Sequence, residues 1–82
     1  MSNSNNEKFL SVLAEVLGTS KQSINDSTSP ENTATWDSFN GLMIITELEK
    51  TFGISFTIEE VTSVHNAGDL KKILGHYGVK FD

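Results

Sequence analysis

The residues best suited to chemistry in this sequence are Trp36-Asp37-Ser38-Phe39, because they open a run that is typical of a helix. Asp37 can accept a backbone N–H bond as the N-cap, which places Ser38 on the first helical turn. The first backbone N–H groups of a helix have no partner within it. They stabilise a nearby anion by about 0.3–1 kcal/mol and can donate to phosphate oxygens. Ser38 is therefore a candidate site for a phosphodiester, although an Asp-Ser pair in front of a helix is often only a cap.

Other reactive groups are scarce. The sequence has no cysteine, which excludes disulfides, thiolate metal sites and a thiol nucleophile of its own. Its two histidines, His65 and His76, are too few for a multi-histidine metal site, and no serine–histidine–aspartate pattern accompanies them. There is no glycine-rich phosphate loop. We therefore predict neither catalytic residues nor a metal site, and we expect the chain not to be an enzyme.

Two amphipathic helices surround a polar segment. Apolar residues at three- and four-residue spacing predict a first helix over about 7–17, which Asn5 or Asn6 could cap and Gly18 could end. The second predicted helix runs over 38–52 and Gly53 ends it. Its apolar face is expected to comprise Phe39, Leu42, Ile45, Leu48 and Phe52.

The rest of the chain predicts a long loop and two further helices. Segment 18–36 is rich in Ser, Thr, Asn and Asp, and only Ile24 and Trp36 could anchor it to a core. Segment 54–58 alternates like a strand, but no second strand exists to pair with it. We predict instead a short third helix, which begins with the capping box Thr57-Ile58-Glu59-Glu60 and ends near Val64.

Asn66 can cap a fourth helix, with Asp69 in its first turn, that buries Leu70, Ile73 and Leu74 and ends at Gly75 or Gly78. The predicted fold class is therefore all-α. It is a four-helix bundle with a short third helix and a long loop between the first two helices. We expect a single domain over residues 1–82, with its core at about 7–77.

The run Asp37-Ser38-Phe39, followed by Leu48-Glu49, Phe52-Gly53-Ile54 and Glu59-Glu60, resembles the acyl carrier protein family. In that family, Asp-Ser-Leu surrounds a modified serine, and the helix that follows ends in Leu-Glu and Phe-Gly-Ile before a short acidic helix. The resemblance extends over about 9–74. Phe39 replaces the usual leucine, and Asn40 and Met43 stand where the family has acids. We therefore expect a specialised rather than a housekeeping member.

The resemblance implies that Ser38 receives phosphopantetheine from coenzyme A through a separate phosphopantetheinyl transferase. Asp37 would help to position the metal-bound coenzyme A. The arm would supply the thiol that the chain lacks, and would hold acyl or aminoacyl intermediates of lipid or secondary metabolite biosynthesis as thioesters. The expected partners are acyl-activating, synthase or transferase enzymes with basic docking faces. The implied partner contacts are Phe39, Leu42, Met43, Glu47, Glu49, Glu59 and Glu60.

An acyl chain could enter the helical core between the second and third helices. The candidate lining residues are Ile45, Leu48, Phe52, Phe56, Val61, Val64 and Ile73. The same residues, together with Ile58 and Leu70, could equally form an ordinary closed core. In that case the cargo stays exposed to solvent or is short and polar.

Charge narrows the choice of partners. Segment 26–69 contains eight acidic residues and a single base, Lys50. Such a surface repels nucleic acid and anionic lipid and attracts basic proteins.

Residues 1–6 lack the pattern of a secretory signal, and no apolar run is long enough to insert stably into a membrane, so we expect a cytoplasmic monomer. The alternative function is a non-covalent acidic helical interaction module in which Ser38 stays unmodified.

Overall fold

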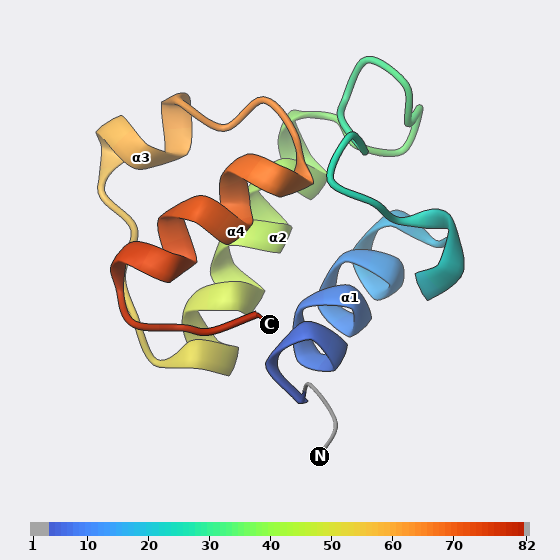
Figure 1. The fold of residues 1–82 in the computed structure, drawn as a ribbon. Helices are drawn as coiled ribbons and strands as arrows, with labels where there is room; N and C mark the ends of the chain where they lie inside the picture. Colours follow the sequence, from blue (N-terminus) through green and yellow to red (C-terminus); the bar gives the residue numbers. More distant parts are fainter. Residues whose placement is uncertain (1–3, 82) are drawn as a thin grey trace.

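The computed structural model describes residues 4–81, and this part of the chain contains four α-helices and no strand (Figure 1). The helices are α1 (Ser4–Leu17), α2 (Ser38–Phe52), α3 (Ile58–Thr62) and α4 (Ala67–His76). A 3-10 helix, η1 (Lys21–Ser23), interrupts the segment between α1 and α2. The all-α prediction with a short third helix is confirmed.

Local signals fix most helix ends as predicted. Asp37 Oδ1 accepts from the N–H of Asn40 at the start of α2, and Gly53 ends the helix in the left-handed conformation with a φ of 65°. Thr57 and Glu60 form both halves of a capping box on α3. Asn66 caps α4 by accepting from the N–H of Asp69. These signals are short-range, so the sequence alone contains them.

Two helix boundaries differ from the prediction. Helix α1 begins at Ser4, so Asn5 and Asn6 lie inside the helix rather than at its cap. The Asn5 side chain instead donates to the carbonyl of Lys80 at 3.1 Å, a contact 75 residues along the chain that no local pattern reveals. Helix α3 ends at Thr62, before the predicted Val64. Helix α4 passes through Gly75 and stops at His76, and Gly78, left-handed with a φ of 93°, ends it as one of the two predicted alternatives.

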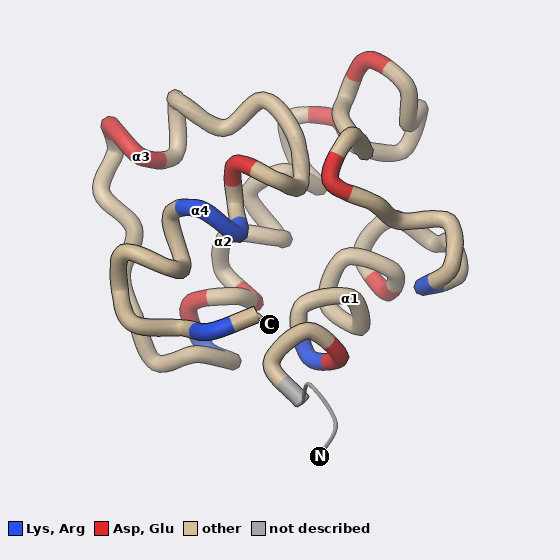
Figure 2. The backbone as a smooth tube through the Cα atoms, viewed as in Figure 1, with Lys and Arg blue, Asp and Glu red and all other residues tan. Residues whose placement is uncertain are grey.

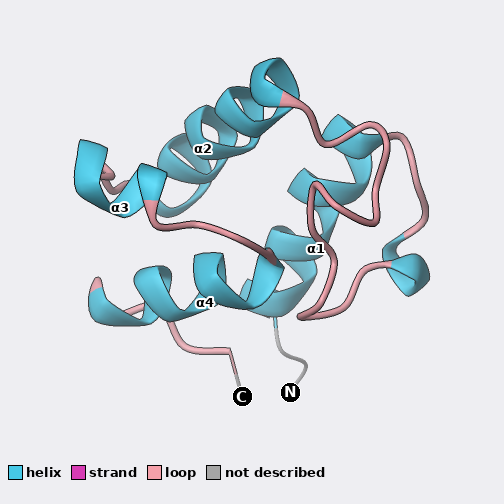
Figure 3. Cartoon of the chain, turned by 90° about the horizontal axis from the view of Figure 1, so that it is seen from above, coloured by secondary structure: helices cyan, strands magenta, loops and turns pink. Residues whose placement is uncertain are grey.

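The buried core lies between α1, α2 and α4. Its fully buried large side chains are Phe9, Leu13, Leu17, Ile44, Leu48, Leu70 and Leu74. Helix α1 and helix α3 lie on opposite sides of the α2 and α4 pair, as Figures 1 and 3 both show. Helix α3 contributes no fully buried residue, and its first residue, Ile58, is 83% exposed rather than part of the core.

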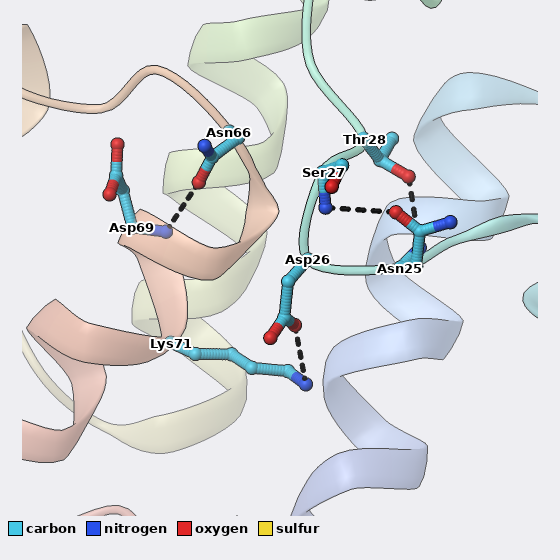
Figure 4. Close-up of polar contacts among 7 residues, drawn as sticks. All are labelled: Asn25, Asp26, Ser27, Thr28, Asn66, Asp69 and Lys71. Carbon is cyan, nitrogen blue, oxygen red and sulfur yellow. Dashed lines mark hydrogen bonds and ion pairs between the residues drawn. The ribbon is translucent and has the colours of Figure 1, made fainter.

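The segment between α1 and α2 is held in place at several points. Ile24 and Trp36 are buried in the core, as predicted. The turn over 25–28 lies against the start of α4 (Figure 4). There the Asp26 carboxylate pairs with Lys71 at 3.1 Å, and the N–H of Ala67 donates to the carbonyl of Thr28 at 2.8 Å. The loop carbonyl therefore accepts from a backbone N–H at the first turn of α4 that has no partner within the helix.

Candidate functional site

Ser38 is the first residue of α2 and its side chain is exposed to solvent. Asp37 precedes it with an extended backbone and holds the first turn through the 2.9 Å bond to Asn40. The next N–H, that of Gly41, donates to the Asp37 carbonyl at 2.8 Å. The N–H groups of Ser38 and Phe39 make no hydrogen bond within the described chain. The hydroxyl thus lies beside two donors that remain available to an anion.

A cavity of about 450 Å³ opens next to this serine, and Asp37 and Ser38 belong to its lining. This volume lies in the range of small-molecule binding sites. Three of the residues predicted to line an acyl pocket, Ile45, Val61 and Val64, line the cavity. The remaining lining residues are Pro30, Trp36, Gly41, Leu42, Ile44 and Leu70.

The other four predicted pocket residues lie elsewhere. Leu48 is fully buried in the core, and Ile73 is 8% exposed on α4 without reaching the cavity. Phe52 packs edge-to-face against Phe81, with ring centroids 6.2 Å apart. Phe56 packs in the same manner against Tyr77 at 6.4 Å. These four residues therefore do not line the cavity beside Ser38, and the two aromatic rings contact Phe81 and Tyr77 instead.

Sequence reasoning missed Trp36 and Gly41 as parts of the site. Trp36 was predicted only as a loop anchor, yet this residue also lines the cavity. Gly41 lies inside α2, where glycine is less favourable than alanine by about 0.8–1.0 kcal/mol. A Cβ at this position would lie 3.3 Å from Trp36 Nε1. A helical glycine three residues after the serine was the signal that could have identified this close approach.

Apolar side chains that face solvent surround Ser38 on α2. Phe39 is 70% exposed, Leu42 60% and Met43 37%. The predicted apolar face of α2 is therefore wrong for Phe39 and Leu42, and Ile44 is buried in their place. Apolar residues occur on most sides of this helix, so periodicity alone could not tell which side is buried.

The acidic residues near the site have different roles. Glu49 accepts from the N–H of Phe56 at 2.8 Å, and Glu47 lies 3.5 Å from Lys50. Glu60 accepts from the N–H of Thr57 and from the hydroxyl of Tyr77. Glu59 is exposed and makes no side-chain bond within the described residues. Two of the four acids predicted to meet partners, Glu49 and Glu60, are thus also used to hold the fold.

The Glu60–Tyr77 contact shifts both ionisable groups. The backbone N–H of Thr57 lowers the pKa of Glu60 below its ordinary value, and the Tyr77 hydroxyl lowers it further. The same contact raises the pKa of Tyr77, because its hydroxyl donates to a carboxylate.

Helix α3 carries only acidic charge, whereas α4 carries the neighbouring lysines Lys71 and Lys72 (Figure 2).

Over 4–81, no three histidine, aspartate or glutamate side chains gather in a way that could hold a metal ion. Within the same residues, no helix combines the length and the apolar character that a membrane crossing needs.

Comparison with known proteins assigns the family. The sequence has no significant match among curated proteins. A family model described as a phosphopantetheine attachment site matches residues 7–74, which is most of the chain and includes Ser38 and the cavity. This match confirms the resemblance to acyl carrier proteins and the expected covalent cofactor, phosphopantetheine. The chain therefore belongs to the family of phosphopantetheine attachment domains.

Proposed function

We propose that this chain is a carrier protein that holds acyl or aminoacyl intermediates as thioesters on phosphopantetheine attached to Ser38, and presents them to partner enzymes. The observation that carries the proposal is the exposed hydroxyl of Ser38 at the start of α2, beside a cavity of about 450 Å³ and inside the matched region. The chain itself acts as a carrier and not as a catalyst.

The residues around Ser38 fit a phosphodiester. The hydroxyl is reachable from solvent, and the N–H groups of Ser38 and Phe39 can donate to phosphate oxygens. Asp37 uses Oδ1 for the helix cap, so Oδ2 is the oxygen that would help to position coenzyme A and its metal ion in the transferase complex. When bound, phosphopantetheine supplies the thiol that forms the thioester, a group that the cysteine-free chain lacks.

Attachment is a balanced group transfer. The Ser38 hydroxyl oxygen bonds to the pantetheine-side phosphorus of coenzyme A, and the pyrophosphate P–O bond to the adenosine part breaks. Adenosine 3′,5′-bisphosphate leaves, and a base in the transferase takes the hydroxyl proton. The role of this chain is to present the hydroxyl without competing contacts, which its exposed position at the first helical residue allows.

The cavity supports partial burial of the cargo. Ile45, Val61 and Val64 give it an apolar wall that starts at Ser38. Each CH₂ group that enters such a wall gains about 0.8 kcal/mol. Helix α3 has no fully buried residue, so it is the helix best placed to shift when an acyl chain enters the cavity.

Partner enzymes would dock around the same serine. Phe39, Leu42 and Met43 expose apolar area on the first turns of α2, where a transferase must approach the hydroxyl. Glu47 and Glu59 supply negative charge for a basic face, and Glu49 and Glu60 add to that field while they hold the fold. Exposed charges of this kind accelerate encounter and are sensitive to salt.

The decisive experiment is incubation with coenzyme A and a broad-specificity phosphopantetheinyl transferase, followed by intact-mass measurement. We expect one added phosphopantetheine on the unmodified chain and none on Ser38→Ala. Ser20→Ala is the matched control, because Ser20 is also exposed and also borders a helix, η1. Absence of any mass change with an active transferase would support the alternative, a non-covalent acidic interaction module.

The identity of the cargo enzymes is a separate question. Phe39, Asn40 and Met43 make the start of α2 less acidic than is usual in the family, which supports a dedicated pathway rather than housekeeping fatty acid synthesis. Competition with a housekeeping carrier for a fatty acid ketosynthase tests this. We expect much slower turnover of this chain, and equal turnover would contradict the specialised role.

A further inference from the structure

Trp36 combines deep burial with an unused hydrogen-bond donor. Only 6% of the residue is exposed, yet its indole N–H donates to no group in the described chain. Among the described residues, no fully buried side-chain nitrogen or oxygen lacks a partner. The indole nitrogen must therefore reach open space, and the open space that Trp36 lines is the cavity beside Ser38.

Gly41 keeps this donor uncovered. A Cβ at position 41 would lie 3.3 Å from Trp36 Nε1 and 3.7 Å from Cδ1, directly against the edge of the ring that carries the N–H. Both residues belong to the cavity lining. The absence of a side chain at Gly41 thus leaves room for a ligand atom at the place where the indole can donate.

The rest of the cavity lining has few polar side chains that could bind such a ligand atom instead of the indole. Apart from Trp36, the polar side chains that line the cavity within the described part of the chain are those of Asp37 and Ser38. An ionised Asp37 accepts hydrogen bonds but donates none, and Ser38 loses its hydroxyl proton once it is esterified. The indole N–H is then the one side-chain donor left in an otherwise apolar lining.

We propose that Trp36 Nε1–H donates a hydrogen bond to a carbonyl oxygen of the group carried on Ser38. This inference rests on the proposed carrier function and makes Trp36 a positioning residue for the group attached to Ser38. The carbonyl belongs either to an amide of the phosphopantetheine arm or to the acyl cargo. An indole N–H is a donor only, so it selects an acceptor of this kind and gives nothing to a plain alkyl chain.

The chain contains a single tryptophan, so a ¹⁵N-labelled sample shows one indole resonance. It is recorded for the unmodified chain, the phosphopantetheine form, an S-hexyl form without a cargo carbonyl, and an S-hexanoyl form. We expect a downfield proton shift and exchange with water slowed roughly two- to tenfold, the effect of a hydrogen bond of ordinary net strength. A shift that is already present in the phosphopantetheine and S-hexyl forms assigns an arm amide. A shift only in the S-hexanoyl form assigns the cargo.

An indole resonance that is identical in all four forms, while the amides of Phe39 and Asn40 shift, overturns the inference and leaves the carrier function intact. A chain that gains no mass with the transferase overturns both. The two failures are therefore distinguishable.

Two variants test the donor directly. Trp36→Phe keeps an aromatic ring and removes the N–H, so a ¹³C label at the assigned carbonyl should move upfield relative to the unsubstituted chain. An unchanged carbonyl resonance contradicts the proposal. Gly41→Ala keeps the tryptophan but crowds its N–H, and we expect it to lose the downfield indole shift. Gly75→Ala is the matched control, since no atom lies within 4 Å of its added Cβ, and it should keep the full shift.

Discussion

The backbone N–H of Gly68 donates to the carbonyl of Asp26 at 3.0 Å and joins the long loop to the first turn of α4. A Cβ at Gly68 would lie 3.2 Å from this carbonyl oxygen, from Asp26 Cβ and from Asn66 Oδ1. A side chain at Gly68 would therefore press against Asp26 and Asn66, which would have to shift by a few tenths of an ångström. The contact matters for function because the same loop continues to Trp36 and Ser38 at the cavity.

We predict that Gly68→Ala lowers the free energy of unfolding by about 1–3 kcal/mol, the usual effect of forcing an extra carbon into a packed contact. Gly75→Ala is the matched control in the same helix. Its Cβ meets nothing within 4 Å, so the higher helix propensity of alanine should leave stability unchanged or raise it by up to about 1 kcal/mol. Urea denaturation of both variants checks this, and equal effects of the two substitutions would contradict the role of the loop contact.

The Tyr77 hydroxyl donates to Glu60 at 2.7 Å and also lies 3.0 Å from the carbonyl of Ser55, so it links α3 to the end of α4. Because the folded pKa of Glu60 is lowered, its contribution to stability is present above the ordinary value of 4.5 and is lost as the pH falls through the folded pKa. The pKa of Tyr77 is raised, so its contribution is present below 10.0 and is lost as the pH rises through the folded pKa.

We predict that Glu60→Gln flattens the acid side of the stability profile. The melting temperature of the unsubstituted chain should fall as the pH drops below the ordinary value of 4.5, and that of the variant should fall less, because the glutamine has no proton to gain. Glu59→Gln is the control, since Glu59 is the exposed neighbour without these bonds. Parallel profiles for the unsubstituted chain and Glu60→Gln would show that another carboxylate dominates acid unfolding.

The sequence predicted those parts of the fold that depend on neighbours in the chain. The caps at Asp37, Thr57 and Asn66 are of this kind, because the acceptor and the donor lie three residues apart. Ser38 was a candidate site for the same reason, since its position follows from the cap that precedes it.

The errors arise where distant segments meet. Phe52 and Phe56 were predicted to line a pocket, but Phe81 and Tyr77 from the C-terminal segment contact their rings. The early start of α1 accompanies a bond from Asn5 to Lys80. No periodicity in one helix reports a partner so far along the chain, and the cavity could therefore be placed only from the structure.

We predict that Phe39→Ala slows phosphopantetheinylation without loss of stability. With 70% exposure, Phe39 contributes little to the core, and its removal should change the free energy of unfolding by no more than about 0.5 kcal/mol. If it anchors the transferase, kcat/KM should fall about five- to tenfold, which corresponds to 1–1.4 kcal/mol. Ile58→Ala is the control, as Ile58 is 83% exposed on α3. Equal losses in both variants would argue against a specific anchor on α2.

The position of the cavity can be tested with acyl chains of increasing length on Ser38. If each added CH₂ is buried with a gain of about 0.8 kcal/mol, protection of the thioester from hydroxylamine should rise roughly fourfold per CH₂ until the cavity is full. Val61→Phe fills the lining that Val61 provides, so the dependence on chain length should flatten while phosphopantetheinylation continues. Phe52→Leu, which alters the packing against Phe81 rather than the cavity, should leave the dependence unchanged. The reverse result, with Phe52→Leu abolishing the dependence and Val61→Phe sparing it, would contradict the placement of the acyl chain in the cavity beside Ser38.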